Sequence, residues 1–203
     1  MSNIFFDTPS GLPVIFIQDF YSQKEFSAIF DELKFLSSID RFKGPEHSNG
    51  PETAYDPEGN ILISGKGMHL DVVYKDRSES DILKVNRKLF SEETITLLES
   101  YHSFFRYVRR SNTDNTKLHY YTDGDYYKSH FDDCVVTAIS FFYTEPKGYT
   151  GGDLLLEHTL TIPCLNNSMV VFPSIMWHEV TPIVMSNFNP NMGRYSMTQF
   201  IAM

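Results

Sequence analysis

The chain has 203 residues, which argues for one domain, because globular domains usually hold about one to two hundred. Its 41% hydrophobic and 21% charged residues allow a real core and exclude intrinsic disorder. The formal net charge of -9 has the wrong sign for a broad face that grips phosphate backbones, so we expect no nucleic-acid partner. Cys134 and Cys164 form no CxxC pair and cannot build a disulfide framework, which favours a reducing compartment.

Targeting and membrane signals are weak in this sequence. The first ten residues hold no basic flank followed by an apolar run, which a signal peptide would need. The longest apolar stretches, such as residues 135–143, have the length of a strand and are too short to cross a membrane. We therefore expect a soluble, cytoplasmic protein without a membrane partner.

The first half of the chain mixes strand and helix signals. A run of Val, Ile and Phe at residues 12–17 predicts a strand. Ser22 and Glu25 have the spacing of a capping box, and the apolar steps of three and four after them predict a helix over residues 23–37. Residues 41–67 are rich in Pro and Gly, so we expect a loop there, either a disordered insert or a lid over a site.

The later elements change from helical to strand-like. Alternation over residues 68–75 predicts a strand, and two helical segments follow at residues 80–90 and 92–109. Beyond them, short strand-like runs separated by turn signals predict a sandwich, jelly roll or barrel. These runs are residues 118–121, 135–143, 153–157, 160–162, 168–172, 179–184 and 195–202.

Three residues form a candidate metal site. His130 and Asp132 are two positions apart, so on a strand both side chains point to the same face. That pair alone means little, because a metal site needs a third ligand, and His178 is the candidate for it. Two histidines and one carboxylate leave coordination positions open, which is the facial triad of non-haem Fe(II) oxygenases rather than a closed zinc site. The remaining histidines, His119 among them, lack such partners and are predicted to be exposed or locally hydrogen-bonded.

The surrounding motifs make the resemblance specific. The chain resembles the Fe(II)/2-oxoglutarate dioxygenases, in particular the prolyl 4-hydroxylase branch, over about residues 117–203, with a looser match over residues 40–110. The motifs are Tyr121-x-x-Gly124-x-x-Tyr127-x-x-His130-x-Asp132, Gly151-Gly152-Asp153-Leu154, His178-Glu179-Val180-Thr181-Pro182 and Arg194-Tyr195-Ser196.

The resemblance implies a fold and an organisation. We expect a mixed α+β fold dominated by β structure, whose core is a double-stranded β-helix of the jelly-roll or cupin-like kind. Residues 117–203 would form this core and residues 12–110 the supporting helices and strands, including the loop 41–67. Residues 1–203 would then be a single domain.

The resemblance also assigns roles residue by residue. The triad of His130, Asp132 and His178 would hold Fe(II) and form the catalytic centre. Arg194 would pair with the distal carboxylate of 2-oxoglutarate, with Tyr121 and Ser196 as further cosubstrate contacts. On the substrate side, the candidates are Tyr127 and Trp177.

The reaction implied is hydroxylation of a C–H bond, in which 2-oxoglutarate and O2 yield succinate and CO2. The expected substrate is a prolyl residue in a peptide or protein, or a related amino-acid-like molecule, with ascorbate as a candidate reductant. Two alternatives stay open: a non-catalytic metal-binding cupin-like module, and an oxygenase of another small molecule or a nucleobase. Nucleobase demethylases carry a second arginine downstream, whereas this chain has none after Arg194.

Two features depart from the pattern of the hydroxylases. Arg194 follows His178 at a wider spacing than usual, so residues 185–192 are predicted to be an inserted loop. Many relatives place a tyrosine on the strand after the His-x-Asp motif, where this chain has Phe141 and Phe142. We expect either a more apolar pocket or a substitution by Tyr143.

Overall fold

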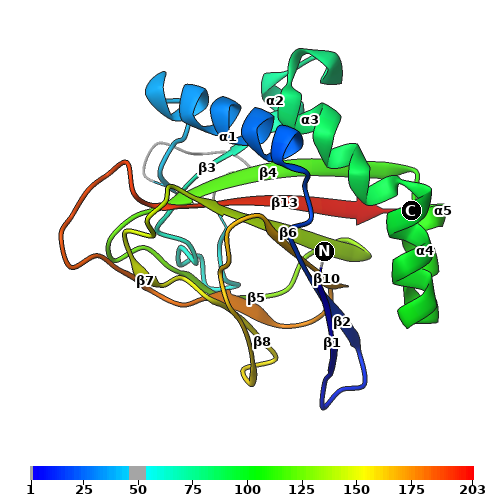
Figure 1. Cartoon of the computed structure of the whole chain (residues 1–203). Coiled ribbons are helices and arrows are strands. Elements are labelled where there is room, and N and C mark those ends of the chain that lie inside the picture. The colour runs from blue at the N-terminus through cyan, green and yellow to red at the C-terminus, as the bar shows by residue number, and fades with distance from the viewer. Residues whose placement is uncertain (1, 46–53) are drawn as a thin grey trace.

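A seven-stranded antiparallel sheet forms the larger layer of the protein. The computed structural model describes residues 2–45 and 54–203 (Figure 1). The order across this sheet is β1 (Ser2–Asp7), β2 (Pro13–Gln18), β10 (Ser168–Pro173), β6 (Val136–Tyr143), β13 (Arg194–Ala202), β4 (Thr113–Tyr121) and β3 (Lys66–His69).

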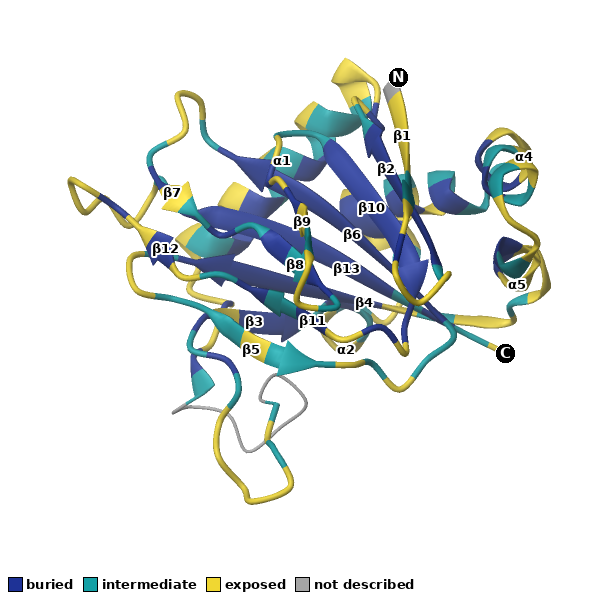
Figure 2. Ribbon diagram, turned by 90° about the horizontal axis from the view of Figure 1, so that it is seen from below, coloured by how far each residue is buried: buried dark blue, intermediate teal, exposed yellow. Residues whose placement is uncertain are grey.

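A smaller antiparallel sheet faces the larger one. Its order is β5 (Tyr127–His130), β11 (His178–Val180), β8 (Leu154–Leu156) and β9 (Leu160–Ile162), and the pair β7 (Thr150–Gly151) and β12 (Ile183–Val184) lies beside it. Leu154 on β8, together with Phe141 and Phe172 on the larger sheet, is fully buried in one hydrophobic cluster. Figure 2 shows that the central strands of the larger sheet, β10, β6 and β13, are buried along most of their length. The expected β-dominated, double-stranded β-helix fold is confirmed.

The side chains of strand β13 pack on both faces of the larger sheet. Its residues alternate between the faces of the sheet, as the period of a strand requires. Tyr195 and Met197 pack in the cluster on the helical side. Arg194, Ser196 and Thr198 line a pocket on the other side, and all three are buried. The polar residues of β13 therefore point into the protein and not into solvent.

Helices cover the outer face of the larger sheet and one of its ends (Figure 1). The predicted capping box begins the first helix: the Glu25 backbone N–H donates to Ser22 Oγ, and the Ser22 N–H donates to Glu25 Oε2 at 2.7 Å. The helical elements are α1 (Gln23–Ser38), α2 (Leu70–Val73), η2 (Arg77–Glu79), α3 (Asp81–Val85), η3 (Asn86–Phe90), α4 (Glu92–Tyr101), η4 (Ser103–Phe105) and α5 (Arg106–Arg110).

The strand predicted over residues 68–75 is wrong beyond His69, where the short helix α2 begins. Asp71 decides this local structure, because its Oδ2 accepts the backbone N–H of Thr116 at 2.6 Å and its Oδ1 accepts from Arg77 at 2.7 Å. As a result Val72, which the alternation placed with the core, is 72% exposed. The two predicted helices that follow are present but each is divided into shorter helical pieces.

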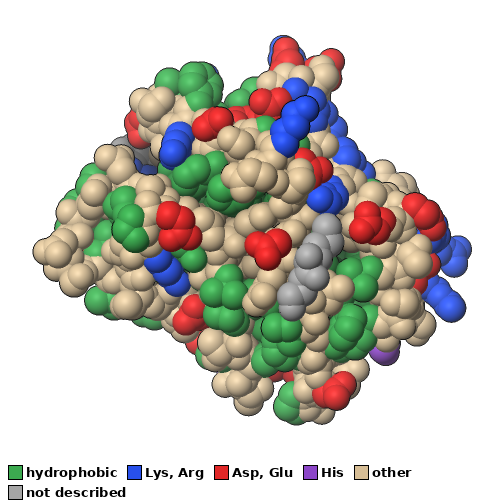
Figure 3. All heavy atoms as spheres, viewed as in Figure 1, with side chains coloured by type: hydrophobic (Ala, Val, Ile, Leu, Met, Phe, Trp, Pro, Cys, Tyr) green, Lys and Arg blue, Asp and Glu red, His purple; other side chains and the backbone are tan. Residues whose placement is uncertain are grey.

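The helical face carries mixed charge, with acidic side chains dispersed among basic ones in Figure 3. Arg109 of α5 lies 2.8 Å from Glu92 and 2.9 Å from Glu99, both on α4. Solvent screens such exposed pairs, so they contribute little to stability. The basic end of α5 is thus paired with neighbouring acids.

The described parts of the predicted loop are residues 41–45 and 54–67, since residues 46–53 lie outside the described residues. Tyr55 pairs with Ile61 in a small antiparallel bridge, and Ile63 pairs with Tyr127 at the start of β5. This loop therefore borders the smaller sheet. Within residues 2–45 and 54–203, no helix is long and apolar enough to span a membrane.

Candidate metal and cosubstrate site

The three candidate metal ligands come from neighbouring elements. His130 is the last residue of β5 and His178 the first of β11, and the two are paired across the strands. Asp132 lies just beyond β5, where its backbone N–H donates to the Ser174 carbonyl at 3.0 Å. The expectation that one strand carries both His130 and Asp132 is therefore wrong for Asp132. A backbone hydrogen bond to the end of β10, and not strand geometry, turns this carboxylate toward the histidines.

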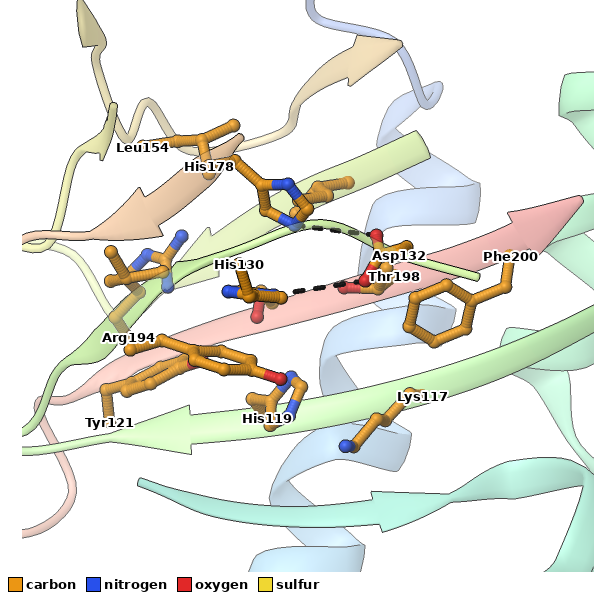
Figure 4. Close-up of a pocket in the computed structure, with 14 residues that line it drawn as sticks. Lys117, His119, Tyr121, His130, Asp132, Leu154, His178, Arg194, Thr198 and Phe200 are labelled. Atoms are coloured by element: carbon orange, nitrogen blue, oxygen red, sulfur yellow. Dashed lines mark ion pairs between the residues drawn. The ribbon is translucent and has the colours of Figure 1, made fainter. Parts of the chain in front are cut away.

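The three side chains converge on one point (Figure 4). His178 Nε2 lies 3.4 Å from Asp132 Oδ2, and His130 Nε2 lies 3.9 Å from Asp132 Oδ1. One ligand atom of each residue lies within 4.8 Å of the others, so this group could hold a metal ion. Two imidazoles and one carboxylate on one side of an ion leave its other positions accessible to small ligands.

Backbone carbonyls orient both imidazoles. His130 Nδ1 lies 2.8 Å from the Lys128 carbonyl oxygen, and His178 Nδ1 lies 2.9 Å from that of Met176. A carbonyl accepts only, so each Nδ1 carries the proton and each Nε2 keeps its lone pair for a metal. Burial, followed by the proximity of His178, lowers the pKa of His130 to about 3. His130 is accordingly neutral at pH 7, as a metal ligand must be.

Asp132 is held by a hydroxyl network. Thr137 Oγ1 donates to Asp132 Oδ2 at 2.7 Å, and Thr137 in turn lies 2.9 Å from Ser174 Oγ. Cys134 Sγ is 2.9 Å from the same Ser174 hydroxyl. This network fixes the carboxylate in the position from which it faces both histidines.

Arg194 lies in the same pocket as the triad and is 1% exposed. Its Nε and Nη1 are buried, and neither makes a hydrogen bond to any residue that the structure describes. The guanidinium carbon lies 5.1 Å from the ring centre of Tyr121 and 4.9 Å from that of Phe141. Buried N–H donors without a hydrogen-bond partner destabilise a protein. A carboxylate matches the fork geometry of the guanidinium donors. Arg194 thus fits a ligand that carries a carboxylate group.

The register of the sheet sets the other predicted cosubstrate contacts. Tyr121 pairs with Arg194, and burial raises the pKa of its phenol, which keeps it protonated. Ser196 is the next inward-facing residue on β13 and is buried in the same pocket. Phe141 pairs with Ser196 while Tyr143 pairs with Arg194, so a phenylalanine and a tyrosine line successive rows of the sheet.

The glycine pair makes room for Arg194. Gly151 and Gly152 have φ angles of 70° and 68°, which only glycine adopts without strain. A Cβ atom on Gly152 would lie 2.4 Å from Ile183 Cδ1 and 3.2 Å from Arg194 Cδ. Gly152 lies between β7 and β8, and its backbone approaches Arg194 so closely that no side chain fits there. The predicted inserted loop at residues 185–192 is also present, between β12 and β13.

The two predicted substrate residues lie on the open side of the triad. Tyr127 stacks on His130, with ring centres 3.8 Å apart. Trp177 is 48% exposed and packs edge-on against Phe131 at 5.1 Å. Both border a second, open cavity of about 670 Å³. It shares Tyr127, His130 and Asp132 with the inner pocket.

His119 and Lys117 are pocket residues that sequence reasoning missed. His119 was expected to be exposed or locally hydrogen-bonded, but it is 4% exposed and its Nε2 has no hydrogen-bond partner among the described residues. The inner pocket is lined by Lys117, His119, Tyr121, Tyr127, His130, Asp132, Ile139, Leu154, His178, Val180, Arg194, Ser196, Thr198 and Phe200. The alternation of residues 117, 119 and 121 on β4 was the available signal.

Comparison with known proteins agrees with this geometry. A sequence profile of the 2OG-Fe(II) oxygenase superfamily matches residues 116–202. An uncharacterized PKHD-type hydroxylase from Synechocystis is 33% identical over 84 residues, a match that covers 32% of this chain and 28% of the relative. The superfamily implies Fe(II) as the metal and 2-oxoglutarate and O2 as cosubstrates.

Solved structures show the same fold. A prolyl-4-hydroxylase from Pseudomonas putida superposes with a TM-score of 0.63 at 13% identity, covering 93% of this chain and 91% of that one. A Trichoplax adhaerens prolyl hydroxylase, in complex with a peptide of hypoxia inducible factor, gives 0.64 at 13% identity and covers 93% and 83%. At these identities the likeness concerns the fold alone. The profile match confirms the resemblance of residues 116–202 to the 2OG-Fe(II) oxygenase superfamily.

Proposed function

We propose that the chain is an Fe(II)- and 2-oxoglutarate-dependent oxygenase that hydroxylates a prolyl residue in a peptide or protein, or a related amino-acid-like substrate. One observation carries the proposal: the His130, Asp132 and His178 side chains share a pocket with the buried Nε and Nη1 of Arg194, which have no hydrogen-bond partner among the described residues. A metal site and a carboxylate site in one pocket are what a chelating keto acid with a distal carboxylate requires.

The triad would hold the metal through His130 Nε2, His178 Nε2 and a carboxylate oxygen of Asp132. When bound, Fe(II) and 2-oxoglutarate supply the activation of O2 that hydroxylates a C–H bond, with succinate and CO2 as co-products. The protein holds the ligand atoms in place before the metal arrives, because carbonyls fix both histidines and Thr137 fixes Asp132.

Arg194 would orient the cosubstrate. Its guanidinium lies behind Tyr121 and Phe141 and is closed off from solvent, which strengthens a charge-assisted pair with a carboxylate. Tyr121, kept protonated, and Ser196 would add hydroxyl groups on the same wall. The apolar Ile139 and Leu154, which line this pocket, would exclude water.

The open cavity beside the triad supports a peptide substrate. Its exposed aromatic rings are Tyr55, Phe131 and Trp177, each about half exposed, and they lie on the Tyr127 and His130 side of the metal site. At about 670 Å³ it has room for several residues of an extended chain. Aromatic grooves of this kind suit proline-containing segments, whose extended conformation costs little entropy to bind.

We further propose that residues 12–110 and 117–203 act as one domain. Side chains connect the two parts: Ser37 Oγ lies 2.8 Å from the Tyr195 hydroxyl, and Gln199 Nε2 donates to the Asn86 carbonyl at 3.3 Å. The helices of the first part also bury the outer face of the sheet to which β13 belongs. The first part would then stabilise the strands that carry the pocket.

The substrate class is testable with peptides. The protein is incubated with Fe(II), 2-oxoglutarate, ascorbate and a library of proline-containing peptides, and succinate and a mass gain of one oxygen are measured. The same peptides with alanine in place of proline serve as controls. Phe131→Ala should weaken turnover, whereas Phe188→Ala, an exposed ring on the 185–192 loop, should not. Succinate release with a nucleobase or free amino acid but with no peptide would overturn the peptide substrate and leave the reaction class intact.

A further inference from the structure

His119 of β4 lies inside the pocket, and one of its ring nitrogens makes no hydrogen bond to the part of the chain that the structure describes. The side chain is 4% exposed and lines the inner pocket, and its Nε2 is buried without a hydrogen-bond partner among the described residues. Figure 4 shows it between Tyr121 and Lys117 along the strand. Buried polar groups in native proteins are nearly always paired, so an unpaired one on a pocket wall points to a ligand.

The ring of His119 is held in place by its neighbours. Gly67 of β3 is opposite it in the sheet, and a Cβ there would lie only 3.1 Å from the imidazole Cδ2. The rings of Tyr121 and Tyr127 lie 5.7 and 5.9 Å away, centre to centre. Packing on these sides fixes the imidazole without giving its Nε2 a partner.

The imidazole is also kept neutral. Burial lowers the pKa of His119 well below its usual value, and the positive charges of Lys117 and Arg194 lower it further. A neutral imidazole carries one N–H donor and one acceptor. It can therefore donate to an anionic ligand without bringing an uncompensated charge into the pocket.

The position of His119 connects the Arg194 end of the pocket with the metal-ligand end. His119 is paired with Ser196, one inward-facing step along the sheet from the pair of Tyr121 with Arg194. On its other side, Tyr127 contacts His119 and stacks on His130. His119 thus lies between the arginine and the triad. In 2-oxoglutarate the two carbons next to the distal carboxylate are methylenes, so the only acceptors beyond that carboxylate are the oxygens of the keto-acid end.

We propose that His119 is a further cosubstrate-binding residue, whose Nε2 donates a hydrogen bond to the keto-acid end of 2-oxoglutarate. This inference rests on the proposed function, because it assumes the same cosubstrate at the same site. His119 would then be the third group that binds 2-oxoglutarate, besides Arg194 and the metal, and it occupies an inward-facing position of β4.

Two substitutions of different chemistry test this role. His119→Phe keeps the ring shape and removes the donor, whereas His119→Gln keeps an N–H donor near the position of Nε2. His158→Phe, at an exposed histidine outside the pocket, is the control. Each protein is titrated anaerobically with Fe(II) and then with 2-oxoglutarate, and the metal-to-ligand charge-transfer band is recorded without O2.

The proposal predicts unchanged Fe(II) affinity in all variants. His119→Phe should weaken 2-oxoglutarate binding about ten- to a hundredfold, as expected for loss of a hydrogen bond to a charged group, and should shift the wavelength of the band. His119→Gln should stay close to wild type. Equal weakening by Phe and Gln would show a purely structural role and overturn the proposal, as would wild-type binding with an unshifted band in His119→Phe.

A measurement on the wild type covers the case in which the variants fail to fold. In the Zn(II)-loaded protein, the imidazole ¹⁵N resonances of His119 should shift on addition of 2-oxoglutarate, and unchanged resonances despite binding would overturn the proposal. Failure of the proposed function looks different, because the wild type itself would then give neither a band with Fe(II) nor any response to 2-oxoglutarate.

Discussion

The Nε2 atom of His178 lies 3.4 Å from the Oδ2 atom of Asp132, and that same carboxylate oxygen accepts a hydrogen bond from Thr137 at 2.7 Å. Asp132 is thus set between a candidate metal ligand and a hydroxyl on the larger sheet. Thr137 is fully buried on β6. The larger sheet therefore determines where the carboxylate of Asp132, which follows β5 of the smaller sheet, points. The metal site depends on the packing of both layers.

Removing this hydroxyl should weaken metal binding while leaving the ligands intact. Thr137→Val keeps the shape of the side chain but frees Asp132 to rotate, so the dissociation constant for Fe(II) should rise about ten- to a hundredfold. Anaerobic Fe(II) titration measures the change. Thr161→Val, an exposed strand position on β9, is the matched control and should bind as wild type does. Equal affinities in the two variants would contradict the role of the hydroxyl.

Arg194 should oppose stability in the cosubstrate-free protein. Because its buried Nε and Nη1 lack hydrogen-bond partners within residues 2–45 and 54–203, Arg194→Met should raise the free energy of unfolding by about 1–3 kcal/mol and abolish stabilisation by 2-oxoglutarate. Urea denaturation with and without the cosubstrate measures both effects, with the exposed Arg110→Met as control. A large loss of stability in cosubstrate-free Arg194→Met would show instead that the protein satisfies this arginine itself.

The glycine turn offers a pair of substitutions that share backbone strain and differ in contacts. Gly152→Ala and Gly59→Ala both place alanine at a positive φ, of 68° and 86° respectively. A Cβ at Gly152 would also collide with Ile183 and press on Arg194, whereas one at Gly59 would meet nothing within 4 Å. We expect Gly152→Ala to be the more destabilising and to weaken 2-oxoglutarate binding, while Gly59→Ala leaves binding unchanged. Thermal unfolding and cosubstrate titration of both variants decide this.

Stability of the metal-free protein should fall in mild acid. The folded-state pKa of His119 is well below 6.5, so between that value and 6.5 the unfolded chain binds a proton that the folded chain does not. The unfolded state is therefore favoured as pH falls below about 6.5, by up to about 1.4 kcal/mol per pH unit for this one group. Urea unfolding at pH 7.5 and 5.5 should show a smaller loss in His119→Phe than in wild type. Identical losses would mean that His119 titrates normally in the folded state.

Much of the site could be predicted because its residues follow local patterns. His130, Asp132, His178 and Arg194 were identified from spacing and resemblance, and the structure brings all four into one pocket. The start of α1 was also predictable, since a capping box satisfies backbone donors within three residues of chain. These features need only their neighbours in sequence or a recurrent motif.

The errors arose where distant contacts decide the structure. Residues 70–73 form a helix because Asp71 accepts a hydrogen bond from Thr116 on β4, which no local pattern reveals. His119 was missed for a related reason. On β4, Lys117 and His119 face the pocket, whereas Leu118 and Tyr120 face the helices. This alternation is typical of a strand with one face in solvent, but both faces of this strand are buried.

The most direct test of the central claim is anaerobic titration of the metal-free protein with Fe(II) and 2-oxoglutarate, with His178→Ala as the control. Wild type should give a visible charge-transfer band that is lost in the variant and that decays with formation of succinate when O2 is admitted. A folded wild-type protein that gives no band would contradict the oxygenase function and would favour a non-catalytic metal-binding module.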